Sequence, residues 1–107
     1  MIKTVFWRES KHITRFQIEG HANYSDYGQD IVCSAVSALA LAIINGMTEI
    51  VKAPANCMID EGRIDCKLEI TSELNDKVQI LAKTLELGIG EIAKEYPDYI
   101  EVKIITK

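Results

Sequence analysis

The chain has 107 residues, of which 48% are hydrophobic and 26% charged, with 12 Lys and Arg against 16 Asp and Glu. This length and composition predict a single globular domain over residues 1–107, large enough to fold without a disulfide or a metal. The net charge of −4 and the lack of a basic run argue against direct binding of nucleic acid.

The cysteine count bears on the cellular setting. Three cysteines are an odd number, and the start of the chain reads as a strand instead of a signal segment. Both features indicate a reducing, cytoplasmic setting, so we expect Cys33, Cys57 and Cys66 to be thiols. The cysteines and His12 lack the short paired spacing of zinc sites, and we predict neither a metal nor a cofactor.

The N-terminal part predicts two strands and a loop. Apolar and polar residues alternate over residues 2–7 and again over 12–19, which is typical of strands with one apolar face. Residues 23–29 have no period and are rich in turn-forming residues, so we expect a surface loop there. Loops of this kind often carry function.

A central helix is predicted over residues 31–47, with Asp30 as its N-cap. Its sequence is mostly Ala, Leu, Ile and Val, so we expect it to be buried nearly all round. The run with few polar residues ends at Ile44, short of the roughly 20 residues that a bilayer requires. We therefore predict a core helix and no membrane association.

The C-terminal half predicts a hairpin, a second helix and a last strand. Apolar and polar residues alternate over 58–68 on both sides of a turn at Glu61-Gly62. A two-residue turn there pairs Cys57 with Cys66 on the apolar face, and we expect both to be core thiols. An amphipathic helix is expected to start at Thr71 or Ser72 and to run to about Tyr96, followed by a strand over 99–105. The order ββαββαβ predicts an α+β domain whose sheet packs against the buried central helix and the amphipathic helix.

Cys33 occupies an unusual position for a structural cysteine, because it falls in the first turn of the central helix. Backbone N–H groups there lack acceptors within the helix, and the helix dipole favours thiolate over thiol. We expect this position to lower the pKa of the thiol and the free N–H groups to hold an oxyanion. The carboxylate of Asp30 would oppose the first effect if it faced the sulfur, and the sequence leaves its orientation open.

His21 lies twelve residues before Cys33, at the other end of the predicted loop. A loop of that length brings both residues within reach of each other, and an imidazole beside a thiol is the minimal set for cysteine-dependent acyl transfer. On spacing alone, purely structural roles for both residues remain the alternative.

Two strings around these residues carry a resemblance: Gly20-His21-Ala22, and Gly28-Gln29-Asp30-Ile31-Val32-Cys33-Ser34-Ala35-Val36-Ser37. They resemble the ribosomal-processing cysteine protease family, Prp. By that resemblance His21 and Cys33 are a catalytic dyad for peptide-bond hydrolysis. The implied substrate is the short N-terminal extension of a large-subunit ribosomal protein, cut after a pair of aromatic residues.

Further residues of the motif and loop have supporting roles in this hypothesis. Asp30 is expected to cap the helix and orient the loop, with a contact to His21 as the alternative. The other supporting residues are Gly20 and Gly28, at permissive backbone positions, and Ser34. Ala22, Tyr24 and Tyr27 form the expected substrate loop, although solvent-facing tyrosines without a role fit the sequence equally well.

Three functional hypotheses follow from these residues. The first is a cytoplasmic cysteine endopeptidase, and the second is a non-catalytic ribosome-assembly or peptide-binding module in which His21 and Cys33 serve only the fold. The third is a redox-sensing thiol protein. The resemblance also implies a homodimer, but core burial alone would explain the apolar helix surfaces as well.

Overall fold

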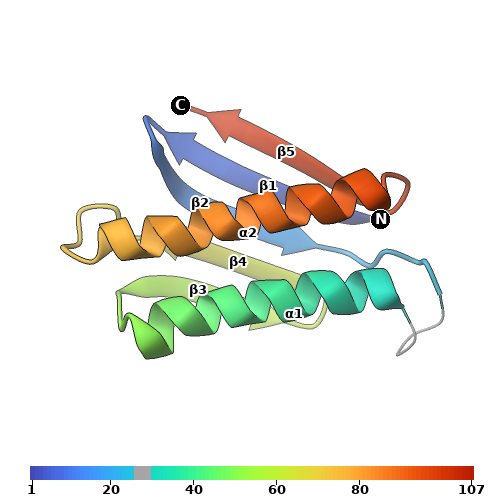
Figure 1. The fold of residues 1–107 in the computed structure, drawn as a ribbon, viewed down its shortest axis with the longest axis horizontal. Coiled ribbons are helices and arrows are strands. Elements are labelled where there is room, and N and C mark those ends of the chain that lie inside the picture. Colours follow the sequence, from blue (N-terminus) through green and yellow to red (C-terminus); the bar gives the residue numbers. More distant parts are fainter. Residues whose placement is uncertain (26–29) are drawn as a thin grey trace.

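Strands and helices follow the predicted order ββαββαβ in the computed structural model, which describes residues 1–25 and 30–107. The strands are β1 (Ile2–Glu9), β2 (His12–Glu19), β3 (Ala55–Asp60), β4 (Arg63–Leu68) and β5 (Ile100–Thr106). The helices are α1 (Ile31–Asn45) and α2 (Asn75–Glu95), and the π-helical turn η1 (Gly46–Ile50) continues α1. Both helices lie on the same side of the sheet (Figure 1). The α+β prediction is therefore confirmed.

The sheet has five strands in the order β3-β4-β2-β1-β5. β1 runs parallel to β5, and the other neighbouring pairs are antiparallel. Alternation along the strands directs one set of side chains, including Phe6 and Phe16, into a core shared with the helices. This order leaves β3 at one edge of the sheet, next to the turn that joins it to β4.

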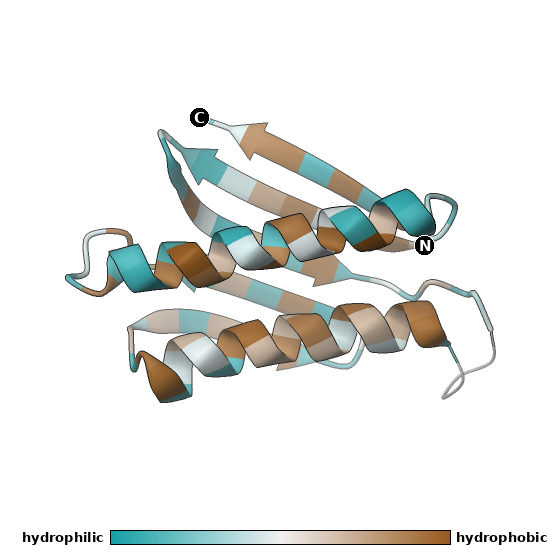
Figure 2. Ribbon diagram, viewed as in Figure 1, coloured by the Kyte–Doolittle hydropathy of each residue, from teal (hydrophilic) through white to brown (hydrophobic). Residues whose placement is uncertain are grey.

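The expectation that the central helix is buried nearly all round is wrong. Val32, Val36 and Ala40 are buried on one face of α1, whereas Ile31 is 55% and Leu41 39% exposed. Figure 2 shows that α1 is apolar along most of its length, including surface that no other element covers. Composition predicted the helix correctly, but the two-layer arrangement gives α1 a neighbouring layer on one side only.

The stretch Ile31–Ile50 also has the length and composition of a membrane span. In the fold it forms α1 and η1, and its buried residues belong to the same hydrophobic core as the sheet. Packing in a two-layer domain accounts for the buried part of this apolar stretch, while Ile31, Leu41 and Ile50 stay exposed.

The second helix begins later than the sequence predicts. The hydroxyl oxygen of Ser72 accepts the N–H of Leu74 at 3.1 Å, and its carbonyl accepts the N–H of Asn75 at 3.1 Å. These bonds close a turn ahead of the helix, so α2 starts at Asn75.

The β3–β4 hairpin has the predicted register, with Cys57 directly opposite Cys66. The two residues form a disulfide, so the expectation of two core thiols is wrong. The cause is their pairing across the ladder, which brings the side chains into contact on one face. Cys33 is the free cysteine of the chain.

A buried amide ties α2 to the sheet. The Gln79 side chain is 4% exposed, and its Oε1 accepts the N–H of Ile13 at 2.8 Å. Its Nε2 donates to the carbonyl of Ile13 at 2.8 Å and to the side-chain oxygen of Asn75 at 3.2 Å. Gln79 thus satisfies both backbone groups of a fully buried strand residue.

Replacing this amide with an apolar side chain of similar size tests its role. Gln79→Leu leaves the N–H and the carbonyl of Ile13 without partners, so we expect the free energy of unfolding to fall by about 2–4 kcal/mol. Urea denaturation measures the loss. The control Lys83→Gln, on the exposed face of α2, should change stability by less than about 0.5 kcal/mol. Equal effects of the two variants would contradict the assignment.

Candidate active site

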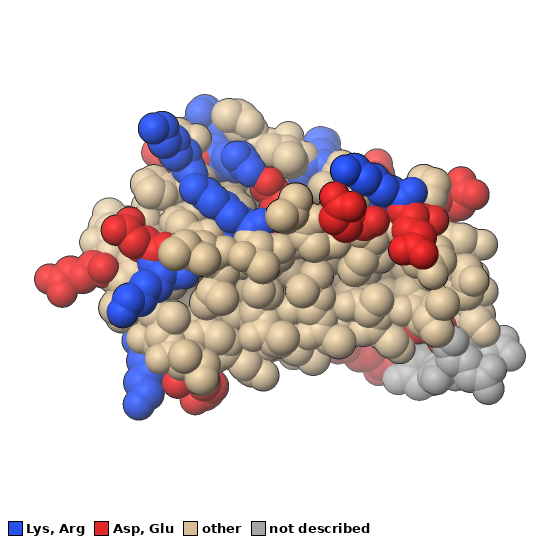
Figure 3. Space-filling model, in the orientation of Figure 1, with Lys and Arg blue, Asp and Glu red and all other residues tan. Residues whose placement is uncertain are grey.

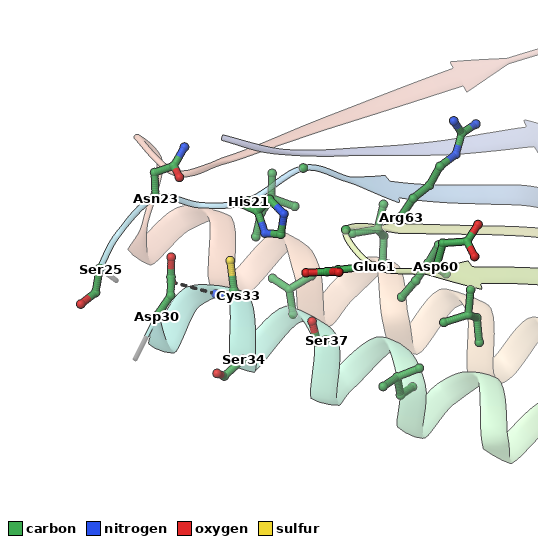
Figure 4. Close-up of a pocket in the computed structure, with 18 residues that line it drawn as sticks. His21, Asn23, Ser25, Asp30, Cys33, Ser34, Ser37, Asp60, Glu61 and Arg63 are labelled. Carbon is green, nitrogen blue, oxygen red and sulfur yellow. Dashed lines mark hydrogen bonds between the residues drawn. The ribbon is translucent and has the colours of Figure 1, made fainter. Parts of the chain in front are cut away.

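Three segments that are distant in sequence meet at one end of the sheet. They are the residues after β2, the first turn of α1, and the β3–β4 turn at Glu61-Gly62 (Figure 4). The N–H of Gly20 donates to the carbonyl of Gly62 at 2.9 Å and fastens the first segment to the third. Gly20 and Gly62 have φ values of +97° and +73°, a backbone region that favours glycine.

A cleft of about 640 Å³ lies between α1 and the β3–β4 hairpin. His21 and Cys33 both line it, together with three of the predicted supporting residues, Gly20, Asp30 and Ser34. The polar side chains of its lining are shown in Figure 4. Its volume is in the range of ligand-binding sites.

The Asp30 carboxylate caps α1, as predicted. Its Oδ1 accepts the N–H groups of Val32 and Cys33, each at 3.0 Å, and its Oδ2 accepts the N–H of Tyr24 at 2.9 Å. The sequence left the orientation of this carboxylate open, and in the structure it faces backbone N–H groups from Tyr24 and from the first turn of α1. The Ser34 N–H donates to the Asp30 carbonyl at 3.0 Å.

This cap overturns one expectation about the first turn. The N–H groups of Val32, Cys33 and Ser34 already have acceptors in Asp30, so they are not free to hold an oxyanion. Burial favours the neutral form of Asp30, but the N–H donors outweigh it and hold the pKa of the carboxyl below its usual value. Asp30 is a buried, charged cap that closes the loop onto the helix.

The Cys33 sulfur accepts one backbone hydrogen bond, from the N–H of Ala22 at 3.1 Å. Burial raises the pKa of the Cys33 thiol, the Ala22 N–H opposes this change, and the negative charge of Asp30 adds to the rise. The prediction that the helix start lowers this pKa is thus wrong. Desolvation and the nearby carboxylate raise the pKa, and the N–H groups of Val32 and Cys33 that would have favoured the thiolate are bonded to Asp30.

His21 is an exposed residue at the end of β2. Its ring lies over Gly62, where an added Cβ would come within 3.1 Å of His21 Nε2. Figure 4 shows the Cys33 sulfur pointing from α1 toward the segment that carries the imidazole. Within residues 1–25 and 30–107 the structure records no hydrogen bond between the two side chains, nor one from Asp30 to His21.

The other predicted residues have mixed outcomes. Ser34 lines the cleft, while the Ala22 side chain is buried in the core at 3% exposure and reaches the site through its backbone. The Tyr24 ring packs edge-on against the rings of Tyr96 and Tyr99, with centroids 5.6 and 5.0 Å away. Its packing therefore anchors the loop to the α2–β5 connection.

Two predictions fall outside the described residues. Tyr27, as part of the substrate loop, and Gly28, as a supporting residue, both belong to positions 26–29. Their roles stay predictions.

Sequence reasoning missed the role of the β3–β4 turn. It predicted Glu61-Gly62 as a hairpin, but nothing in the sequence connects that turn with His21, which lies far earlier in the chain. The contact arises because β4 pairs with β2, which places the turn beside the end of β2. Among the residues that the structure describes, no three His, Cys, Asp or Glu side chains gather as metal ligands.

Comparison with known proteins assigns the chain to a family. The model of the cysteine protease Prp family matches residues 1–101. The ribosomal processing cysteine protease Prp of Bacillus subtilis is 28% identical over 105 residues, with 92% of each chain covered. The crystal structure of SMU.848 from Streptococcus mutans is 32% identical, with a TM-score of 0.87 over 100% of this chain and 96% of that one.

A further solved structure extends the likeness of the fold. The ribosomal processing protease Prp of Staphylococcus aureus, in complex with a covalently linked product peptide, is 24% identical. It superposes with a TM-score of 0.90, covering 97% of this chain and 99% of that one. Because the family model spans nearly the whole chain, the protein belongs to the Prp family of cysteine proteases.

Proposed function

We propose that the protein removes the short N-terminal extension of a large-subunit ribosomal protein, cutting after aromatic residues, with His21 and Cys33 as the catalytic dyad. One observation carries this proposal: the free cysteine and the exposed histidine line the same cleft. Prp of S. aureus has been solved with a substrate peptide and with a covalently linked product peptide, which supports a peptide as the occupant here.

The chemistry follows from the positions of these two side chains. Because burial raises the pKa of the Cys33 thiol, the resting sulfur carries a proton that His21 accepts during the reaction. The thiolate attacks the scissile carbonyl carbon, a C–S bond forms, and the carbonyl electron pair moves to oxygen. The C–N bond then breaks as His21 returns the proton to the leaving amine, and water hydrolyses the thioester. No step in this sequence uses a cofactor.

The proposal extends to setting and partners. We place the reaction in the cytoplasm, where ribosomal proteins are processed, with the ribosomal protein extension as the direct partner. Neither nucleic acid nor a membrane is part of the proposed interaction. The net charge of −4 supports a protein partner over a nucleic acid.

We also propose that two copies associate through the helical layer. Figure 3 shows a face largely free of charged side chains over α1 and toward α2. Ile50 is 81%, Ile80 67% and Leu87 68% exposed on this layer. Apolar side chains at this exposure favour association with another surface.

The dyad is tested with a peptide that carries an extension ending in an aromatic pair. We expect the native protein to cleave it, and Cys33→Ser and His21→Ala to lose at least about 10³-fold in kcat/KM. Mass spectrometry locates the cut. His12→Ala is the matched control, because this half-buried histidine contacts Asn75 away from the cleft and should keep full activity.

Other outcomes of this experiment discriminate between hypotheses. If the native protein binds the peptide without cutting it, the non-catalytic binding module becomes the better interpretation. If His21→Ala cleaves as fast as the native protein, the cysteine acts without this histidine and the dyad is wrong.

The turn beneath His21 gives a second test. Gly62→Ala places a Cβ 3.1 Å from His21 Nε2 and strains a backbone at φ +73°, so we expect a roughly 10-fold fall in kcat/KM as the imidazole shifts. Gly90→Ala is the control, because its Cβ would meet no atom within 4 Å and should stabilise α2 slightly. Unchanged kcat/KM in a folded Gly62→Ala protein would show that the turn does not position His21.

The dimer is tested by sedimentation. We expect the native protein to sediment as a dimer at micromolar concentration and the double variant Ile80→Lys and Leu87→Lys to sediment as a monomer, because burying ammonium groups is costly. Ile105→Lys, at the β5 edge strand, is the control and should remain dimeric. A monomeric native protein would rule out this association.

A further inference from the structure

We propose that the backbone N–H of Ala22 is a catalytic donor, which first stabilises the Cys33 thiolate and then the oxyanion of the tetrahedral intermediate. This inference rests on the proposed function. It assigns oxyanion stabilisation to a backbone N–H that follows β2. The sequence predicted this role for N–H groups in the first turn of α1.

The position of this N–H group carries the inference. It donates to Cys33 Sγ at 3.1 Å, within the usual range for a hydrogen bond to sulfur. The Ala22 side chain is buried at 3% exposure, and the N–H of nearby Gly20 is fixed by the carbonyl of Gly62. The donor is thus held from both sides, which is the preorganisation that charge stabilisation requires.

The competing donors are occupied. Asp30 accepts the N–H groups of Val32 and Cys33 through its carboxylate and that of Ser34 through its carbonyl. Freeing the first two would break the cap of α1 and leave the buried carboxylate with the Tyr24 N–H as its one remaining donor among these three. Of the described N–H groups around Cys33, the one that the structure directs at the sulfur belongs to Ala22.

One donor serves both charged species because the two atoms are neighbours. When the thiolate attacks, its charge passes through the new C–S bond to the carbonyl oxygen, which is attached to the same carbon. The sulfur then attracts the N–H less, and the oxygen attracts it more. The hydrogen bond therefore transfers from sulfur to oxygen without a backbone rearrangement, and it returns to sulfur when the thiolate is released.

A backbone ester removes this donor and little else. The chain is assembled by ligating a synthetic segment 1–32 to segment 33–107 at Cys33, with lactic acid in place of Ala22. The matched control has an ester at Asn23, whose N–H has no acceptor in the described structure. Circular dichroism and urea denaturation establish that both esters fold.

Two readouts are compared between the esters and the native chain. The pH midpoint for iodoacetamide alkylation of Cys33 should rise by about one unit in the Ala22 ester, since a hydrogen bond to a charged group is lost. The kcat for peptide cleavage should fall about 10²–10³-fold, as for loss of an oxyanion donor. The Asn23 ester should match the native chain in both.

Each alternative result is decisive. An Ala22 ester with native midpoint and native kcat overturns the inference, as does an equal loss in both esters. A shifted midpoint with native kcat overturns the oxyanion role alone. If the native chain cleaves no peptide, the proposed function fails, while the alkylation midpoint still decides whether Ala22 supports the thiolate.

Discussion

The buried carboxylate of Asp30 is the interaction on which the site depends. It is 6% exposed, and it accepts N–H groups from Val32 and Cys33 on the helix and from Tyr24 on the loop. A charge at this depth is tolerated because these donors replace water. The same three bonds cap the helix, join Tyr24 to the start of α1 and fix where the Cys33 side chain leaves the backbone.

That arrangement has an electrostatic consequence for Cys33. Burial and the Asp30 charge both raise the pKa of the Cys33 thiol, and the Ala22 N–H opposes them. A thiol that stays protonated at rest reacts slowly with oxidants and other electrophiles, because the thiolate is the reactive form. In the mechanism proposed above, activation comes when His21 removes this proton beside a bound peptide.

The sequence predicted what depends on local pattern. Alternation located β1, β2 and the β3–β4 register, and the position of Asp30 before an apolar run predicted its cap, since these follow from neighbouring residues. It mispredicted the burial of α1 and the pKa of Cys33, because both depend on how the elements pack. It also placed the start of α2 too early, because a local turn closed by Ser72 precedes the helix. The Cys57–Cys66 disulfide was predicted in part. The sequence pattern predicted that the two cysteines pair across the hairpin, but it does not determine whether paired thiols are oxidised.

The position of the β3–β4 hairpin shows how the site depends on strand pairing in the sheet. His21 follows β2 directly, yet its ring lies over Gly62, and Gly62 is there because β4 pairs with β2 from Arg15 opposite Lys67 to Glu19 opposite Arg63. A slip of one residue in that ladder would turn every side chain of β4 to the other face and carry the turn away from the imidazole. The burial of Ile64, Cys66 and Leu68 in the hydrophobic core opposes such a slip. The hydrophobic core thus sets the register, the register places the turn, and the turn lies against the histidine ring. The ladder of β2 and β4, rather than the disulfide, defines this dependence, because both Cys57 and Cys66 lie in the β3–β4 hairpin.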